Sequence, residues 1–354
     1  MVAKKSKKTE ETDWISELPD CLLHHIFSSV DTTGIVRTCI LSKRWRYFWT
    51  SSPDLNFTYD GLEQDDHSNF ITQLLQHRNS IPLNSFSYSM FMLDVEASVV
   101  ESWIAYAVKH QVQHLTLYLQ ACCLNRPIQF PNCFFGCTSL TTLIFDGNFN
   151  QAILLPKTFD LPSLKYLHLC AFHNIDARNL NPFFYGIQYF SVPSLISFDI
   201  LNAEVEAPDL FSEFEFVIVA PNLRKFKFEG YPPFLCSTKN LSSLDLIEID
   251  LPCEYELDED QFEDEVRQDM ARNVLQMLNA FHIAKSVTLS MAAIKVLSDI
   301  PTFLNEHPSL FPNLKYLEVQ SNESSKNVKN LKIPNFIFDY FRKGSSLLEI
   351  IVAK

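Results

Sequence analysis

The hydrophobic and polar positions of this chain repeat one short unit along most of its length. The unit reads apolar-x-x-apolar-x-apolar, and its ten instances begin at residues 83, 112, 140, 164, 195, 223, 244, 284, 314 and 347. The steps between successive starts run from 21 to 40 residues. Self-similarity at such steps predicts stacked structural repeats, because one unit cannot bury its apolar side alone.

The alternation inside each unit predicts a short strand with two different faces. The last two apolar residues point inward, and the residues beside them point outward. The outward residues are mostly polar, as in Lys225, Lys227 and Glu229. Such alternation favours a sheet that is open on one face. Several units also share a Pro-Ser or Pro-Asn lead-in, as in LPSLKYLHL and FPNLKYLEV.

We therefore predict an α/β fold in which residues 83–354 form irregular leucine-rich repeats. They would build a solenoid of the ribonuclease-inhibitor type, with a parallel sheet on its concave face. The 40-residue step carries an insertion, because residues 254–265 hold eight acidic residues and no basic one. An amphipathic helix is expected directly after it. Its apolar face would contain Val266, Met270, Val274, Leu275, Leu278 and Phe281.

The N-terminal part has a helical pattern instead. We predict a disordered tail at 1–12, a three-helix module at 13–58 and a connecting or capping helix at 59–82. Thr32 or Thr33 would cap the second helix and Ser42 the third. The first helix would follow Pro19 with one apolar face made of Leu18, Leu22, Leu23, Ile26 and Phe27. The third would carry Trp45, Phe48 and Trp49.

A specific motif runs from the second into the third of these helices. Residues 36–46 read Val-Arg-Thr-Cys-Ile-Leu-Ser-Lys-Arg-Trp-Arg, after a leucine-proline start at Leu18 and Pro19. This motif resembles the F-box of plant F-box proteins, and the C-terminal repeats resemble the leucine-rich domains of the same family. The chain departs from the family at residues 28–31, which replace the usual leucine-proline. Gly34 follows, at a cost of roughly 1 kcal/mol relative to alanine near a helix start.

The resemblance implies a substrate-receptor subunit of an SCF-type cullin ubiquitin ligase. The F-box would dock on a Skp-family adaptor, and the repeats would bind the protein to be ubiquitinated. The implied adaptor contacts are Leu18, Pro19, Leu22, Ile26, Val36, Leu41 and Trp45. The chain itself would not be an enzyme, because catalysis would come from a conjugating enzyme elsewhere on the scaffold.

Charge and composition exclude several other classes of function. The formal charge of −13 argues against nucleic acid and anionic membranes as partners. Only seven glycines are present, far apart, so no glycine-rich phosphate loop exists. Nine cysteines without a Cys-x-x-Cys pair fit reduced thiols, and we expect no metal and no cofactor. The N-terminus has no signal-peptide pattern, which predicts a cytoplasmic or nuclear protein.

Large outward side chains on the strands are the candidates for substrate binding, since aromatic residues contribute disproportionately to interfaces. Two alternatives stay open: a leucine-rich scaffold without adaptor binding, and a hormone-type receptor in which a small ligand completes the substrate site. A deep pocket with convergent basic residues would favour the latter. The outward candidates are Tyr118, Tyr166, His168 and Tyr316.

Overall fold

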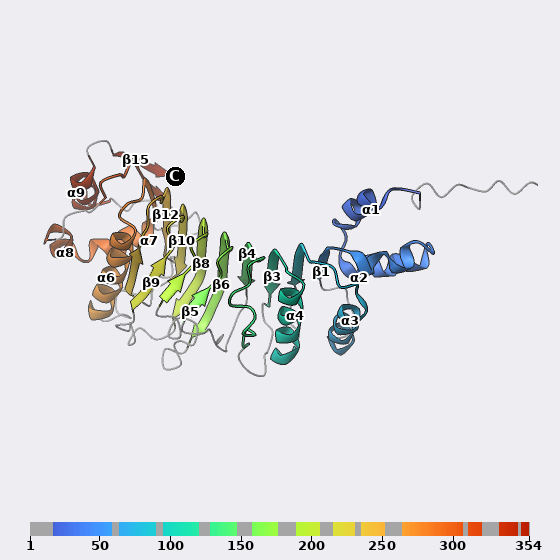
Figure 1. Ribbon diagram of the computed structural model, residues 1–354. Coiled ribbons are helices and arrows are strands. Elements are labelled where there is room, and N and C mark those ends of the chain that lie inside the picture. The colour runs from blue at the N-terminus through green and yellow to red at the C-terminus, as the bar shows by residue number, and fades with distance from the viewer. Residues whose placement is uncertain are drawn as a thin grey trace, which may run out of the picture.

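The computed structural model shows a row of strands between an N-terminal group of short helices and a C-terminal group of helices (Figure 1). The acidic run lies almost wholly outside the described residues, as does the N-terminal tail. The structure describes residues 17–58, 64–89, 95–119, 128–146, 158–175, 189–205, 215–230, 235–251, 264–306, 311–320, 333–345 and 348–353.

One sheet of eleven parallel strands runs through the molecule, and its strands follow each other in chain order. The ten predicted strands are all present, so the prediction of a parallel-sheet solenoid is confirmed. They are β2 (Ser85–Ser89), β3 (His114–Tyr118), β4 (Thr142–Asp146), β6 (Tyr166–Ile175), β8 (Ser197–Val205), β10 (Lys225–Gly230), β12 (Leu246–Asp250), β13 (Ser286–Ser290), β14 (Tyr316–Gln320) and β15 (Glu349–Ala353).

The inward positions of the strands from β2 to β14 form continuous rows in the core, whereas Val352 of the terminal strand β15 is 52% exposed. In one row Leu115 stands in register with Leu143, which stands in register with Leu167. The row continues through Phe198 to Phe226, and each of the five side chains is at most 2% exposed. Full burial of such a side chain is worth about 1.5–3 kcal/mol relative to exposure. The repeats are therefore held together by the pattern from which they were predicted.

The layer behind this sheet changes along the chain, and the sequence analysis did not foresee the change. Four short strands form a second parallel sheet behind the middle repeats. They are β5 (Thr158–Asp160), β7 (Tyr189–Ser191), β9 (Glu215–Val219) and β11 (Leu235–Lys239). Helices replace them towards the two ends. These are α3 (Gln64–His77), α4 (Ala97–Lys109), α6 (Asp264–Ala280), α7 (Met291–Ser298), α8 (Pro301–Glu306) and α9 (Asn335–Gly344).

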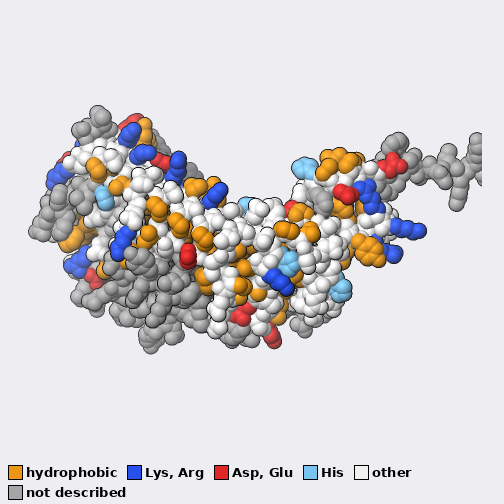
Figure 2. Space-filling model, in the orientation of Figure 1, with side chains coloured by type: hydrophobic (Ala, Val, Ile, Leu, Met, Phe, Trp, Pro, Cys, Tyr) orange, Lys and Arg blue, Asp and Glu red, His pale blue; other side chains and the backbone are white. Residues whose placement is uncertain are grey.

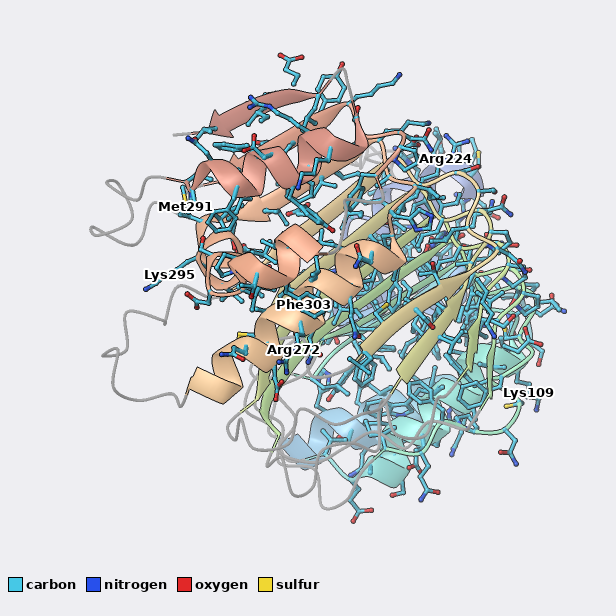
Figure 3. All side chains as sticks on the ribbon, turned by 90° about the vertical axis from the view of Figure 1, so that its left-hand side faces the viewer. Lys109, Arg224, Arg272, Met291, Lys295 and Phe303 are labelled. Atoms are coloured by element: carbon cyan, nitrogen blue, oxygen red, sulfur yellow. The ribbon has the colours of Figure 1, made fainter. Side chains whose placement is uncertain are left out.

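The predicted amphipathic helix is α6, and it packs on the back of the sheet. The view from the C-terminal end shows α6 to α9 gathered on one side of the strands (Figure 3). Phe281, just after α6, stacks on Phe226 of β10 with ring centroids 4.2 Å apart. The opposite face of the large sheet carries the outward positions, and we call it the open face.

Polar side chains in the turns before β10 and β12 bind the preceding repeat; Asn222 belongs to a Pro-Asn lead-in, whereas Ser242 does not. The Asn222 amide donates a hydrogen bond to the carbonyl oxygen of Pro193 at 2.8 Å, and the Ser242 hydroxyl donates one to that of Pro221 at 2.8 Å. Each side chain thus reaches back one repeat and satisfies a turn carbonyl. The hydrogen bonds fix the stacking of neighbouring turns.

The N-terminal module consists of α1 (Asp20–Phe27), α2 (Thr32–Arg37), η1 (Thr38–Ile40) and η2 (Trp45–Ser51). The predicted caps need correction. Asp31, not Thr32 or Thr33, caps α2 by accepting a hydrogen bond from Gly34 N at 3.1 Å. The third helix is 3₁₀, and its N-cap Arg44 makes no side-chain cap bond. Ser42 lies earlier and accepts a hydrogen bond from Arg44 N at 3.2 Å.

The sheet begins one strand earlier than the pattern indicated. β1 (Asp54–Thr58) pairs with β2 in parallel, although the sequence analysis kept these residues with the helical module. Ser52 stands where the other units have their first apolar residue, so the pattern failed there. Thr32 joins α2 to β1 by accepting a hydrogen bond from Asn56 N at 2.8 Å. The helical module and the sheet are therefore directly connected.

Candidate functional site

The helical module has a small core of its own, built from three of its helices. Phe27 of α1 meets Trp45 of η2 edge-on, with ring centroids 5.5 Å apart, and also contacts Phe48. Leu23 and Ile35 complete the cluster, and all five side chains are buried. Leu23 and Phe27 are one helical turn apart, which places both on the inner face of α1.

The other apolar residues of α1 face outward. Leu22 and Ile26 are also one turn apart, and each is 48% exposed. Pro19 is exposed at the start of the helix. The apolar face predicted for α1 is thus divided between a packed side and an exposed side. Hydrophobic side chains gather over α1 on the molecular surface (Figure 2).

The remaining predicted adaptor contacts differ in accessibility. Leu41 is 68% exposed after η1. Leu18 is partly buried against the module's core, and Val36 is partly buried against the core of the repeats. Trp45 is only 8% exposed and packs in the module's core. Contact of any of these residues with an adaptor stays a prediction.

Three exposed apolar residues of the module were missed. Ile40 is 86% exposed, Tyr47 is 67% exposed and Val30 is 37% exposed. The chain passes into a 3₁₀ turn after Arg37, and Ile40 at the end of this turn faces outward. A run of two apolar residues, Ile40 and Leu41, just before the Ser42 turn is the signal that could have identified Ile40.

A hollow of about 250 Å³ lies on the open face over β4, β6 and β8. Three of the four predicted substrate contacts line it: Tyr118, Tyr166 and His168. The fourth, Tyr316, lies on β14, with four strands between it and β6. The structure therefore groups three of these residues and separates the fourth. Thr142, Leu143, Ile144, Leu167, Ser197 and Asp199 complete the lining.

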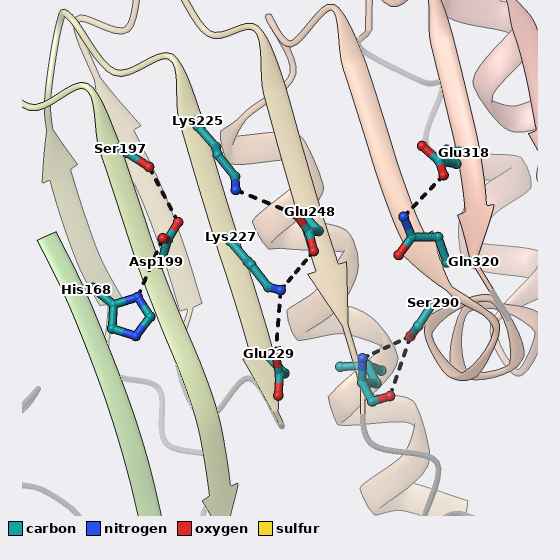
Figure 4. Close-up of polar contacts among 11 residues, drawn as sticks. His168, Ser197, Asp199, Lys225, Lys227, Glu229, Glu248, Ser290, Glu318 and Gln320 are labelled. Atoms are coloured by element: carbon teal, nitrogen blue, oxygen red, sulfur yellow. Dashed lines mark hydrogen bonds and ion pairs between the residues drawn. The ribbon is translucent and has the colours of Figure 1, made fainter. Parts of the chain in front are cut away.

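The polar end of the hollow is a block of four residues on two paired strands. Tyr166 stands in register with Ser197, and His168 with Asp199. Asp199 Oδ2 is 3.6 Å from His168 Nδ1, and Asp199 Oδ1 accepts a 3.5 Å hydrogen bond from the Ser197 hydroxyl (Figure 4). Ser197 and Asp199 were not among the residues predicted as substrate contacts.

The next strands along the open face carry a set of ion pairs. Lys227 Nζ lies 2.9 Å from Glu248 Oε1 and 3.7 Å from Glu229 Oε2, and Lys225 Nζ lies 4.0 Å from Glu248 Oε2 (Figure 4). Burial acts to lower the pKa of Lys227, but the hydrogen bond and charge of Glu248, with Glu229 and Asp250, raise it above its ordinary value. Both lysines therefore form ion pairs with carboxylates on their own strand or on β12.

Within the described ranges, no group of three or more His, Cys, Asp or Glu side chains is arranged to hold a metal ion. None of the helices described here combines the length and apolar character needed to cross a membrane.

Comparison with known proteins identifies the N-terminal module and relates the repeats to a family. The F-box domain family matches residues 15–56. F-box/LRR-repeat protein 13 of Arabidopsis thaliana is 32% identical over 174 residues, which cover 47% of this chain and 37% of that protein. A putative F-box/FBD/LRR-repeat protein of the same plant is 26% identical over 375 residues, which cover 96% of this chain and 78% of the relative.

Another putative F-box/LRR-repeat protein of Arabidopsis thaliana is 26% identical across 83% of this chain and 63% of its own length. The chain thus spans well under two thirds of the first of these relatives. Together, the F-box match, the similarity across both parts of the chain and the parallel sheet of repeats confirm the predicted resemblance to plant F-box proteins with leucine-rich repeats.

Proposed function

We propose that this chain is the substrate-receptor subunit of an SCF-type cullin ubiquitin ligase. Its F-box docks on a Skp-family adaptor, and its open face binds the protein to be ubiquitinated. The observation that carries the proposal is the distribution of exposed apolar side chains. Of the ten large hydrophobic residues exposed in the described part of the chain, six lie between Leu22 and Tyr47.

The exposed side chains in the F-box are not remnants of an incomplete fold. The module already has a packed core around Phe27 and Trp45, so Leu22, Ile26 and Leu41 are additional to it. Apolar groups concentrated in one region of a soluble protein commonly mark a surface that another protein covers. A Skp-family adaptor is the partner that the F-box match supports.

Contacts between the F-box and the sheet hold the two in a fixed relative orientation. Trp49 packs against both the core of the F-box and the core of the repeats. Together with the hydrogen bond from Asn56 to Thr32, this contact holds the docking module against the first strand. A receptor acts by raising the local concentration of substrate near the conjugating enzyme, so a fixed orientation serves that role. The proposal assigns no catalytic group to this chain.

The adaptor surface is tested with two similarly exposed isoleucines at opposite ends of the molecule. Ile26 is 48% exposed on α1, and Ile351 is 43% exposed on the open face of β15. We expect Ile26→Glu to weaken binding of a purified Skp-family adaptor by about thirtyfold, since loss of an interface anchor costs about 2 kcal/mol. Ile351→Glu should bind as the parent does. Calorimetry measures affinity, and circular dichroism with melting curves verifies folding.

Failure of the folded parent to bind any Skp-family adaptor would remove the ligase role and leave the scaffold alternative. Equal losses in both variants would show that the effect is not specific to the F-box. The hormone-type alternative gains no support from the described hollow, because the convergent basic residues that it requires do not line it. Lys225 and Lys227 are instead paired with Glu248.

A further inference from the structure

The hollow on the open face combines an exposed aromatic side chain with an accessible carboxylate. Tyr166 is 49% exposed, so its side chain is accessible from solvent. Asp199 stands diagonally across the same two strands, and its side chain is 24% exposed. Exposed tyrosines beside polar groups are typical of interface anchors.

The volume of the hollow indicates how large a group it can accept. Sites for drug-sized small molecules have volumes of about 300–1,000 Å³. The hollow has about 250 Å³ and opens on the face of the sheet, which suits one long side chain of a bound protein. Thr142 and Ile144 form an uncharged floor beside Tyr166 and His168. An aliphatic stem can lie on that floor.

The charge around the hollow indicates whether it favours a positively or a negatively charged group. The open-face positions of β8, β10 and β12 carry four acids, Asp199, Glu229, Glu248 and Asp250, against the two lysines Lys225 and Lys227. The local excess is therefore two negative charges. Lys227 stands in register with Asp199, but its ammonium group is paired with Glu248 and Glu229 instead.

The Asp199 carboxylate retains capacity for a further donor. An ionised carboxylate can accept about four hydrogen bonds. Only Ser197 and His168 approach it among the contacts of the described residues, one on each oxygen. These contacts orient the carboxylate, and they leave room for a cationic donor. The neighbouring tyrosine ring also favours a cation, since Lys and Arg groups bind aromatic faces by about 0.5–2 kcal/mol.

We propose that this hollow binds an arginine or lysine side chain of the recognised protein. The stem lies over Thr142 and Ile144, the cationic head is held by Asp199, and Tyr166 covers it. His168 and Ser197 are positioning residues for Asp199. The inference rests on the proposed function in that the occupant belongs to the substrate protein. It deepens that function by naming the chemistry of one recognised residue.

The experiment selects peptides from a displayed random library on the folded full chain and on four variants. Asp199→Asn removes the charge and keeps the shape. Tyr166→Leu removes the ring, whereas Tyr166→Phe keeps it. Glu318→Gln is the matched control, because Glu318 is an open-face carboxylate on the distant strand β14. The preferred peptide and its basic-to-glutamine analogue are then measured by calorimetry.

We expect arginine or lysine to be enriched at one peptide position. Affinity should fall about tenfold or more in Asp199→Asn, because a hydrogen bond to a charged group is worth about 1.5–3 kcal/mol. Tyr166→Leu should also weaken binding, whereas Tyr166→Phe and Glu318→Gln should not. Binding that is equal in Asp199→Asn, enrichment without a basic residue, or no enriched peptide at all would each overturn the inference.

Adaptor binding is measured on the same preparations to separate the two proposals. If the adaptor binds and basic peptides do not, the inference about the hollow fails alone. If basic peptides bind through Asp199 and the adaptor does not, the ligase role fails and the hollow stands as a recognition site of a scaffold.

Discussion

The guanidinium group of Arg78 donates hydrogen bonds from Nε and Nη2 to the carbonyl oxygen of Ser52, at 3.2 and 2.7 Å. Nη1 donates to the carbonyl oxygens of Ile81 at 3.0 Å and Asn79 at 3.3 Å. Arg78 is 6% exposed and follows α3, whereas Ser52 is the C-cap of η2 within the F-box. One buried cation thus links the F-box to the first two strands of the sheet.

We expect Arg78→Met to lower the free energy of unfolding by about 3 kcal/mol or more. The substitution removes the donor of the Ser52 and Ile81 carbonyl oxygens, whereas the Asn79 carbonyl keeps a hydrogen bond from Ile81 N at 2.8 Å. Each unsatisfied group costs about 1–3 kcal/mol. Arg78→Lys should lose less, because an ammonium group can still reach one of them. Urea unfolding followed by circular dichroism measures the difference. A loss below about 0.5 kcal/mol in Arg78→Met, the size of an ordinary surface substitution, would show that water replaces the guanidinium.

The pattern of apolar residues did not predict this junction between the F-box and the sheet. Ten strands could be predicted because each has an apolar residue three positions before its first inward residue. Ser52 takes that position before β1, and the buried contacts of Arg78 give no periodic signal. The four strands of the second sheet were missed because they are three to five residues long and carry no repeated pattern of their own.

The candidate site was only partly predictable for a different reason. Tyr166 and His168 were identified as outward residues from their own strand. Their grouping with Asp199 depends on the register between two repeats, 31 residues apart in sequence, which the spacing of a single unit does not give. In the F-box, both sides of α1 are apolar, so composition could not tell the packed Phe27 from the exposed Ile26.

Gly34 lies close to the cap of α2, and its substitution should not give the usual benefit of alanine. A Cβ atom at this position would lie 2.6 Å from Asp31 Oδ1 and 2.8 Å from Val30 Cγ1. Alanine normally gains about 1 kcal/mol over glycine inside a helix. Here it displaces the cap, which is worth about 1 kcal/mol. We expect Gly34→Ala to be neutral or destabilising in thermal unfolding.

A double-mutant cycle with Asp31→Ala isolates the cause. Without the carboxylate there is no cap to displace, so Gly34→Ala should be more favourable in the Asp31→Ala background than in the parent. The expected coupling between the two substitutions is about 1 kcal/mol. Additive effects would mean that the cap moves aside at no cost.

Tyr340 connects α9 to α6, and we expect its ionisation to make the stability of the protein depend on pH in the alkaline range. Its hydroxyl donates a hydrogen bond to Asn279 Oδ1 at 3.2 Å, and burial raises its pKa to about 12. We expect Tyr340→Phe to lose about 1 kcal/mol of stability at pH 8, because that hydrogen bond is removed.

The sign of the pH effect follows from the raised pKa. The unfolded tyrosine ionises near pH 10, so between pH 10 and about 12 the unfolded parent binds fewer protons than the folded parent. Stability of the parent therefore falls in that window by about 1.4 kcal/mol per pH unit, a loss that phenylalanine cannot have. Urea unfolding of both proteins at pH 8, 10 and 11 should show the parent's advantage disappearing. A constant difference would mean that Tyr340 is hydrated in the folded state.

Variants of Trp45 can show whether this residue of the F-box motif contacts the adaptor or only packs in the core. It is 8% exposed and meets Phe27 edge-on, so Trp45→Ala should remove the core contact and cost about 3–5 kcal/mol. Adaptor binding would then be lost together with the fold of the module. Trp45→Phe keeps an aromatic ring beside Phe27, and we expect it to retain most of the stability.

The comparison of Trp45→Phe with Ile26→Glu separates the two roles, because the second variant changes an exposed side chain and leaves the core intact. If Trp45 only packs, Trp45→Phe binds the adaptor nearly as tightly as the parent, whereas Ile26→Glu is folded and binds more weakly. If Trp45 instead contacts the adaptor, Trp45→Phe stays folded but loses affinity. Melting curves and adaptor calorimetry on the same samples therefore assign the residue to the core or to the interface.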